Sequence, residues 1–444
     1  MRKSAVVSFI SAICMGVIVT PSYALDLSLS DAVERVIAES NDLKRANANV
    51  DQAQAQLDAV NANRWFKLDG TVSYSNMVNV EKPFSSRAIT LPPELGGMLS
   101  AELDGQSISF EMPDNIFTAG LSLTQPIYTF GKIGNAVKSV KSAIKMADSS
   151  RELTRREVAY AGANLYWTAK MTDEIVALAQ NDLNNARSAR RRLTAAGRAN
   201  RSNLVKIESD IASKEINLSD AKFNRDTAHR MLKIMAGIDL DEELILTDQF
   251  PQTFGPLSVP EKLESTPEWD ILTEQINMYE RNARSQRANA YPTLAATASY
   301  SYYSMVGDIG HMFDTKGSQS ASVGVALQVP IFSGGLNRAN ATIQAMNAEA
   351  VRQDLDKSRK LTSEKYDNAI KQYNHLRGNL AKLEDARDLA AKAYQFSQDR
   401  FGAGQTSAVE LADVSAGLYQ LDMALLNMKY NILMSEQSIK KLAN

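Results

Sequence analysis

The sequence predicts a mainly helical fold that is built twice along one chain, from long coiled-coil helices and four β-strands. Three observations carry this prediction. An apolar heptad ladder near the end of the chain recurs about 207 residues upstream in the same phase, which indicates an internal repeat. Four segments alternate between apolar and polar residues, as β-strands do. Two intervals of about 65 residues lack proline and are rich in Ala, Leu, Lys, Arg, Gln and Glu, which favour helices.

The chain begins with the features of a secretory signal peptide. Arg2 and Lys3 precede an apolar run over residues 5–19, and a small-x-small pattern ends at Ala24. We therefore expect residues 1–24 to be removed on export; a retained anchor is the alternative, disfavoured because the apolar run is short. Cys14 is the single cysteine and lies in this segment, so we expect no disulfide and no acyl anchor in the mature chain. No later stretch has the ~20 apolar residues of a membrane helix, which leaves a periplasmic, secreted or outer-membrane location.

The first repeat is expected over residues 25–236. A helix at about 30–64 precedes strands near 68–80 and 116–128, and the loop 81–115 between them contains prolines and glycines. A helix of roughly 100 Å follows between Gly131 and Gly197. The repeat ends in a helix at about 201–236, which carries the upstream heptad ladder from Leu204 to Met235.

The second repeat is expected over residues 265–444, after a linker at 237–264 that contains several prolines. It repeats the order of the first: a helix at about 265–290, strands near 293–305 and 319–332, and a long helix between Gly335 and Gly404. The last helix, at about 407–442, carries the downstream ladder from Leu411 to Leu442.

The four strands have one apolar face and one face of small polar residues. Strands facing lipid are apolar on that side, whereas the side facing a water-filled lumen is polar. A soluble antiparallel sheet with one face on a core would show the same alternation. If the strands cross a membrane, four are too few to close a barrel, so several chains must share one, and three chains would supply twelve strands. The positions expected to line such a pore are Thr71, Ser73, Ser122, Thr297, Ser299 and Ser322.

The sequence has few of the residue patterns that catalysis or cofactor binding requires. The three histidines are His229, His311 and His375, and no pair stands at metal-ligand spacing. There is no phosphate-binding loop, dinucleotide fingerprint or nucleophile elbow. With 51 acidic and 49 basic residues the chain has no global field suited to nucleic acid. We therefore expect no enzyme activity, no metal, no cofactor and no nucleic-acid partner.

Four short motifs carry a resemblance to a known family. They are QPIYTFG at 125–131, YPTL at 291–294, VPIFSGG at 329–335 and RFGAG at 400–404. In this order and spacing the exported, duplicated chain resembles the outer membrane factor family, the TolC-like channels, over residues 25–444. The resemblance implies a homotrimer with a shared twelve-strand barrel in the outer membrane and a helical coiled-coil tunnel projecting into the periplasm.

The same resemblance implies a function in export. The channel would be the exit duct of a tripartite efflux or type I secretion system, docked to a periplasmic adaptor (membrane fusion) protein and an inner-membrane pump or ABC transporter. It would export small molecules such as drugs and toxic compounds, or proteins. A periplasmic coiled-coil adaptor or structural protein, or a substrate-selective porin, are the alternative readings.

The hairpin turns are the remaining candidate sites. Gly197 and Gly404 lie between paired helices, where chain reversal favours positive φ, and in the family such turns meet the adaptor. Glu410 and Asp413 stand i, i+3 on the next helix and match the family's acidic constriction, where threefold rings of carboxylates would select cations. The closing lock of the family is not matched. The residues at its positions, and two arginines that could replace them, are Phe401, Thr406, Asn203, Arg198 and Arg201.

Overall fold

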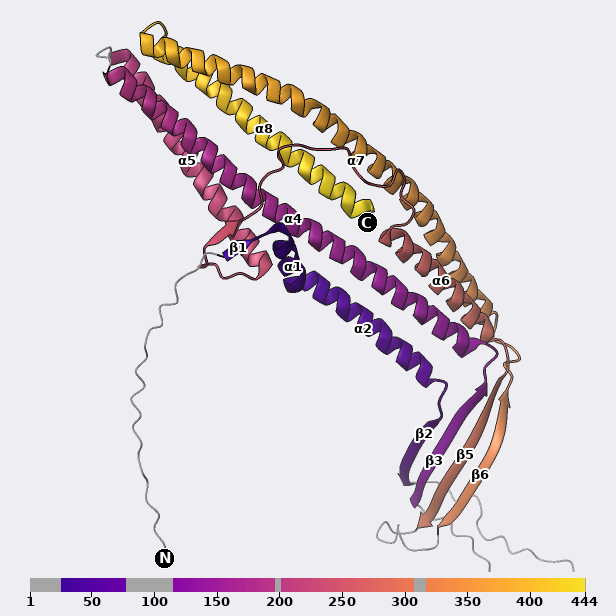
Figure 1. Ribbon diagram of the computed structural model, residues 1–444. Helices are drawn as coiled ribbons and strands as arrows, with labels where there is room; N and C mark the ends of the chain where they lie inside the picture. The colour runs from indigo at the N-terminus through magenta and orange to yellow at the C-terminus, as the bar shows by residue number, and fades with distance from the viewer. Residues whose placement is uncertain (1–24, 77–114, 196–200, 307–316, 444) are drawn as a thin grey trace, which may run out of the picture. The chain divides into compact units, whose positions relative to one another are not determined.

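The computed structural model describes residues 25–76, 115–195, 201–306 and 317–443 (Figure 1). Most of these residues are helical and a few form strands, which confirms the mainly helical fold class. The signal segment 1–24 and most of the loop expected at 81–115 lie outside the described residues. The chain forms two compact units. The first comprises Met1–Ala48, Ser149–Trp269 and Lys357–Asn444, and the second comprises Asn49–Asp148 and Asp270–Asp356.

Two helical hairpins dominate the first unit. The C-terminal part of α4 (Lys132–Ala195) pairs with α5 (Arg201–Ala236), and that of α7 (Leu336–Ala403) pairs with α8 (Ala408–Ala443) (Figure 1). Many positions of the predicted ladders are buried, among them Ile207, Ile211 and Leu218 on α5 and Leu411 on α8. The heptad spacing therefore identified the faces by which these helices pack.

The helix expected at about 30–64 is interrupted. The chain forms α1 (Leu29–Glu39) and α2 (Asn41–Ala62), with Ser40 between them. The Ser40 amide donates to the carbonyl of Ile37, and its hydroxyl accepts from the Leu43 amide at 3.2 Å. Ser40 thus ends one helix and caps the next, as serine does at helix N-termini.

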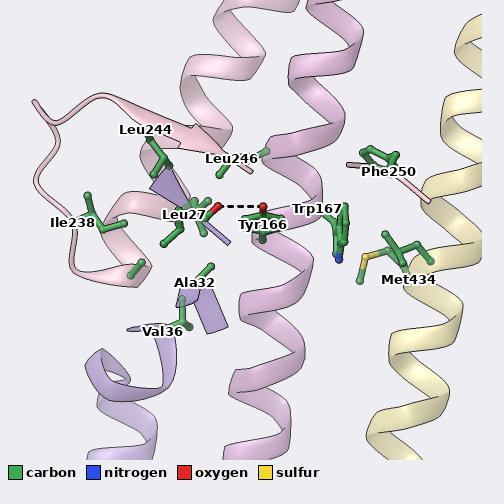
Figure 2. Packing of buried hydrophobic residues seen from close by; sticks show 14 of the residues in the cluster. Leu27, Ala32, Val36, Tyr166, Trp167, Ile238, Leu244, Leu246, Phe250 and Met434 are labelled. Carbon is green, nitrogen blue, oxygen red and sulfur yellow. Dashed lines mark hydrogen bonds between the residues drawn. The ribbon is translucent and has the colours of Figure 1, made fainter. Parts of the chain in front are cut away.

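The expected linker contains a strand that the sequence did not indicate. β4 (Leu244–Leu246) pairs in parallel with β1 (Leu25–Leu27), so the start of the described chain is hydrogen-bonded to the segment between the repeats. This small sheet closes an apolar cluster (Figure 2). In that cluster Tyr166 points at Leu27, and Trp167 lies near Phe250 and Met434. Three-residue strands carry too little alternation to be read from sequence.

The proline-containing segment after β4 is fastened to α7. Tyr366 and Tyr373, one heptad apart on α7, are 1% and 2% exposed. Their hydroxyls donate to the carbonyls of Pro260 at 2.6 Å and Gly255 at 2.8 Å. Buried hydroxyls that find backbone acceptors fix the path of a segment with no regular structure of its own.

A four-stranded antiparallel sheet characterises the second unit. Its strands are β2 (Lys67–Asn76), β3 (Asn115–Tyr128), β5 (Thr293–Val306) and β6 (Ser318–Gln328), in the order β2-β3-β5-β6 (Figure 1). β3 and β5 are the central pair, so the strands of the two chain halves form one sheet. β6 ends at Gln328, four residues before the expected limit near 332. Pro330 follows two residues later and has no amide hydrogen to donate to a neighbouring strand. The end expected for the first strand, near 80, lies outside the described residues.

Three helices pack together in the second unit. α6 (Pro267–Ala288) contacts the first part of α4, where the Ser139 hydroxyl donates to the Met278 carbonyl at 3.1 Å. Arg352, on the first part of α7, forms an ion pair with Glu280 of α6. Buried alanines such as Ala283 and Ala348 allow the helices of this unit to approach closely.

Candidate functional site

The sheet presents one continuous polar face. Ser122 of β3 lies opposite Asp69 on one side and Ser299 on the other, and Ser299 lies opposite Ser322. Residues opposite one another, and residues two apart on one strand, share a face. The structure therefore brings all six candidate pore positions, Thr71, Ser73, Ser122, Thr297, Ser299 and Ser322, to the same face.

Hydroxyl pairs run across this polar face. The hydroxyl oxygens of Ser299 and Ser322 are 2.8 Å apart, and those of Ser301 and Ser320 are 2.7 Å apart. The Ser73 hydroxyl pairs in the same way with Thr118 at 2.5 Å. Of these residues, Ser73, Ser299 and Ser322 were among the expected pore positions, and Thr118, Ser301 and Ser320 occupy the same phase of the alternation. The face also carries Lys67 and Asp69, one charge of each sign.

The opposite face of the sheet is apolar and uncovered. Aliphatic side chains on this face are between 52% and 89% exposed, and they are Leu68, Val72, Leu121, Val323, Val325 and Leu327. No helix of the second unit covers these side chains. Every residue of β2 and β6, the two edge strands, is exposed in the single chain. Such a surface indicates an environment that is itself apolar.

The turn between α7 and α8 has defined geometry. Gly404 adopts a φ of +75°, its amide donates to the Phe401 carbonyl at 3.1 Å, and the Gln405 amide donates to the Arg400 carbonyl at 2.8 Å. These two bonds form a Schellman motif, which a left-handed glycine completes. Ser407 precedes the first residue of α8 and caps that helix, because its hydroxyl accepts from the Glu410 amide at 3.1 Å. Gly197, in the other turn, lies outside the described residues.

The two acidic gate candidates are exposed. Glu410 and Asp413 lie on one face of the first turns of α8. Glu410 is 3.9 Å from Arg400, which is not one of the gate candidates expected from the sequence, and both side chains are more than half exposed. An exposed pair at this distance contributes little to stability. The carboxylates are therefore available to the solvent at this end of the hairpin.

The positions of the expected lock residues differ in their surroundings. Phe401 is 6% exposed and packs in a cluster with residues of α4, α5 and α8, so it has a structural role. The Thr406 hydroxyl is buried and has no hydrogen-bond partner in the described part of the chain. Asn203 and Arg201 lie in the first turn of α5, where Arg201 is exposed, and Arg198 lies outside the described residues.

None of the helices in the described ranges combines the length and the apolar character that crossing a membrane requires.

Comparisons with known proteins identify the class to which this arrangement belongs. The model of the outer membrane efflux protein family matches residues 32–237 and 272–444. The chain therefore belongs to the outer membrane efflux protein family, which confirms the resemblance seen in the sequence and the outer-membrane location.

Individual relatives have low sequence identity to this chain, and two of those named here align over most of its length. The probable outer membrane lipoprotein SilC of Salmonella typhimurium is 17% identical over 419 residues, which cover 92% of this chain and 84% of SilC. The outer membrane protein TolC of Escherichia coli K12 is 22% identical over 231 residues, 50% of this chain and 47% of TolC. The crystal structure of VceC from Vibrio cholerae matches with a TM-score of 0.74 at 17% identity, covering 94% of this chain and 96% of VceC.

Proposed function

We propose that the chain forms a homotrimer whose three sheets close into one twelve-strand barrel in the outer membrane, the exit duct of a tripartite efflux system. The two-faced sheet carries this proposal. An apolar face that no helix of its unit covers fits lipid, and a face of hydroxyls fits a water-filled lumen.

The edges of the sheet support three chains rather than one. β2 and β6, the edge strands, each present a row of backbone groups that no other described strand pairs with. In lipid each unpaired group would cost several kcal/mol, so the edges must be joined to other strands. Pairing β6 of one copy with β2 of the next satisfies both edges, and three copies give an allowed barrel size.

The outer faces of the hairpins support the same assembly. Val205, Ile216, Phe223 and Ile234 on α5 are 58–71% exposed, and their spacings of 11, 7 and 11 residues place them on one stripe. Leu361, Leu389 and Phe396 make a second stripe on the part of α7 in the same unit. Exposed apolar stripes at helical spacing form a seam when neighbouring copies meet.

The repeats and partners complete the proposal. In each half a helical segment, α1 with α2 or α6, precedes two strands of the four-stranded sheet, a long helix and a shorter helix, which supports duplicated repeats at 25–236 and 265–444 around the linker 237–264. Residues 1–24 would be the export signal. The hairpin ends around Gly197 and Gly404 would meet a periplasmic adaptor protein, which connects the duct to an inner-membrane pump.

Cysteine labelling tests the assignment of the two faces. Ser299→Cys should react in intact outer membranes with a water-soluble maleimide, whereas Val325→Cys and Leu123→Cys should be shielded by lipid. The same unheated samples should run on a gel near three times the 48.7 kDa of the chain. Labelling at positions 325 and 123 with none at 299 would reverse the faces, and a monomer band would exclude the shared barrel.

A further inference from the structure

A buried ion pair lies inside the first hairpin, at a position where the heptad ladder predicts an apolar residue. Lys214 occupies a ladder position of α5, and its ammonium is 2.6 Å from the carboxylate of Asp182 on α4. The two side chains are only 7% and 11% exposed. A second carboxylate, that of Asp210, lies 3.8 Å from Lys214. Burial raises the pKa of Asp210 above its usual value.

This pair also bonds the second hairpin. The Ser415 hydroxyl on α8 donates to the other oxygen of the Asp182 carboxylate at 3.2 Å, and Ser415 is 8% exposed. Two oxygens of one carboxylate thus connect α5 and α8 to α4. A cavity of about 20 Å³ beside this contact is lined by residues of all four helices, including Asp210, Tyr394, Leu411 and Ser415. The cavity is large enough for one small group such as a methyl.

The chemistry of this cluster indicates that its side chains position the helices and contribute little to the stability of the fold. Well-packed apolar residues in place of a buried ion pair often leave a fold equally or more stable, so the pair itself is weak evidence for a stabilising role. Apolar contacts at a helix seam are also non-directional, and they tolerate sliding of one helix past another. Hydrogen bonds to a carboxylate require a fixed distance and direction.

We propose that Asp182, Lys214 and Ser415 are positioning residues that hold the two hairpins at a fixed spacing, and that this spacing sets the width of the passage between the hairpin ends. The second half of this statement rests on the proposed channel function. The first half concerns the hairpins alone and can be tested separately.

Ser415→Ala is the sharpest variant, because it removes the bond between hairpins and keeps the Asp182–Lys214 pair. Ser397→Ala is the matched control: Ser397 is also a buried serine of the second hairpin, but its hydroxyl has no hydrogen-bond partner in the described chain. Ser415→Thr should restore the wild-type spacing, because its hydroxyl remains and the adjacent cavity receives the added methyl group.

Spin labels at the exposed positions 194 and 403 report the spacing directly. They are attached to cysteines introduced at these positions in the exported protein, whose expected mature chain has no other cysteine, and labelled chains are diluted among unlabelled ones. In Ser415→Ala the distance distribution should broaden and shift to longer values, whereas Ser397→Ala and Ser415→Thr should match the wild type. In planar bilayers Ser415→Ala should raise the ratio of wide to narrow conductance states by roughly tenfold.

A double variant separates positioning from stability. Asp182→Leu with Lys214→Met should leave the unfolding temperature unchanged or higher, yet should broaden the distances as Ser415→Ala does. Unchanged distances in both variants would overturn the positioning role. Altered distances with unchanged conductance would overturn the link to the passage, while an unheated trimer band would still support the proposed assembly.

Discussion

Single buried side chains connect distant segments of the first unit by hydrogen bonds, and Tyr166 is the clearest case. It is completely buried, and its hydroxyl lies 2.7 Å from the Asp248 carboxylate and 3.2 Å from the Leu27 carbonyl. The same carboxylate accepts from the Leu29 amide at 2.7 Å, at the start of α1. Burial raises the pKa of Tyr166 far above its usual value, so it stays a donor at any physiological pH.

Tyr166→Phe should lower the free energy of unfolding by about 1–3 kcal/mol, because it leaves buried acceptors without their donor. Thermal unfolding followed by circular dichroism measures the effect. Tyr160→Phe is the control, since it keeps the ring on which Lys441 packs at 5.1 Å and should change stability by less than about 0.5 kcal/mol. Equal effects in both variants would show that the Tyr166 hydroxyl contributes nothing specific.

Asp210 gives a pH-dependent prediction. Burial raises its pKa in the folded state above the reference value of 3.8, so its contribution to stability is greatest below pH 3.8 and is lost as pH rises through the folded pKa. Asp210→Asn should therefore raise the unfolding temperature at pH 7 and have little effect near pH 3.5. Unfolding curves of both proteins at the two pH values measure this. A constant difference at both pH values would contradict the assigned cause.

Features that repeat at a short interval along the chain were predictable from the sequence, whereas contacts between residues distant in the sequence were not. Alternation alone placed Thr71 with Ser73, and Thr297 with Ser299, on one face of their strands, because strand geometry fixes that relation. The bonds of Tyr166 to Asp248 and of Ser415 to Asp182 join residues 82 and 233 positions apart. No periodicity connects such pairs, so only the folded chain shows them.

At the scale of elements, the ends of helices follow their capping residues. Glycine at 404 and proline near the strand ends were visible in the sequence and mark real boundaries. The break at Ser40 was missed because serine is neutral inside a helix and becomes a cap only when its own backbone leaves the helical region.

Gly404→Val tests the turn between α7 and α8. At a φ of +75° a β-branched residue should cost roughly 1–2 kcal/mol, visible as a lower unfolding temperature. Gly402→Ala, two residues earlier within α7 and with open space around its Cβ position, should instead stabilise by up to about 1 kcal/mol. If the turn also meets the adaptor, Gly404→Val should weaken adaptor binding while trimers persist. A valine variant as stable as wild type would show that the turn can adopt another conformation.

At the scale of the whole molecule, the ends of the two hairpins differ in charge. The described residues from 183 to 207, at the end of the first hairpin, include six basic side chains and no acidic one: Arg187, Arg190, Arg191, Arg192, Arg201 and Lys206. The end of the second hairpin carries Asp399, Glu410 and Asp413 with Arg400. The chain as a whole has a net charge of −2, so this separation is a local feature. Threefold assembly would alternate basic and acidic ends around one axis.

In the proposed trimer such an arrangement would make the acidic ends the element that selects small cations. In the proposed trimer, Glu410 and Asp413 would each form a ring of three carboxylates, and carboxylate rings attract cations and bind multivalent ones. Arg400 offsets this field only weakly, because at 3.9 Å from Glu410 and exposed to solvent it is well screened.

Glu410→Gln with Asp413→Asn should therefore lower the cation preference of the channel and abolish its block by multivalent cations. The physical reason is loss of the only negative charges on the first turns of α8, without a change in side-chain size. Reversal potentials in a salt gradient and titration with a trivalent cation in planar bilayers measure the two effects. Asp51→Asn with Asp58→Asn removes the same charge from exposed positions on α2 and should leave both properties unchanged. If selectivity and block survive in the first double variant, the constriction lies elsewhere along the passage, and the basic end of the first hairpin becomes the element to vary.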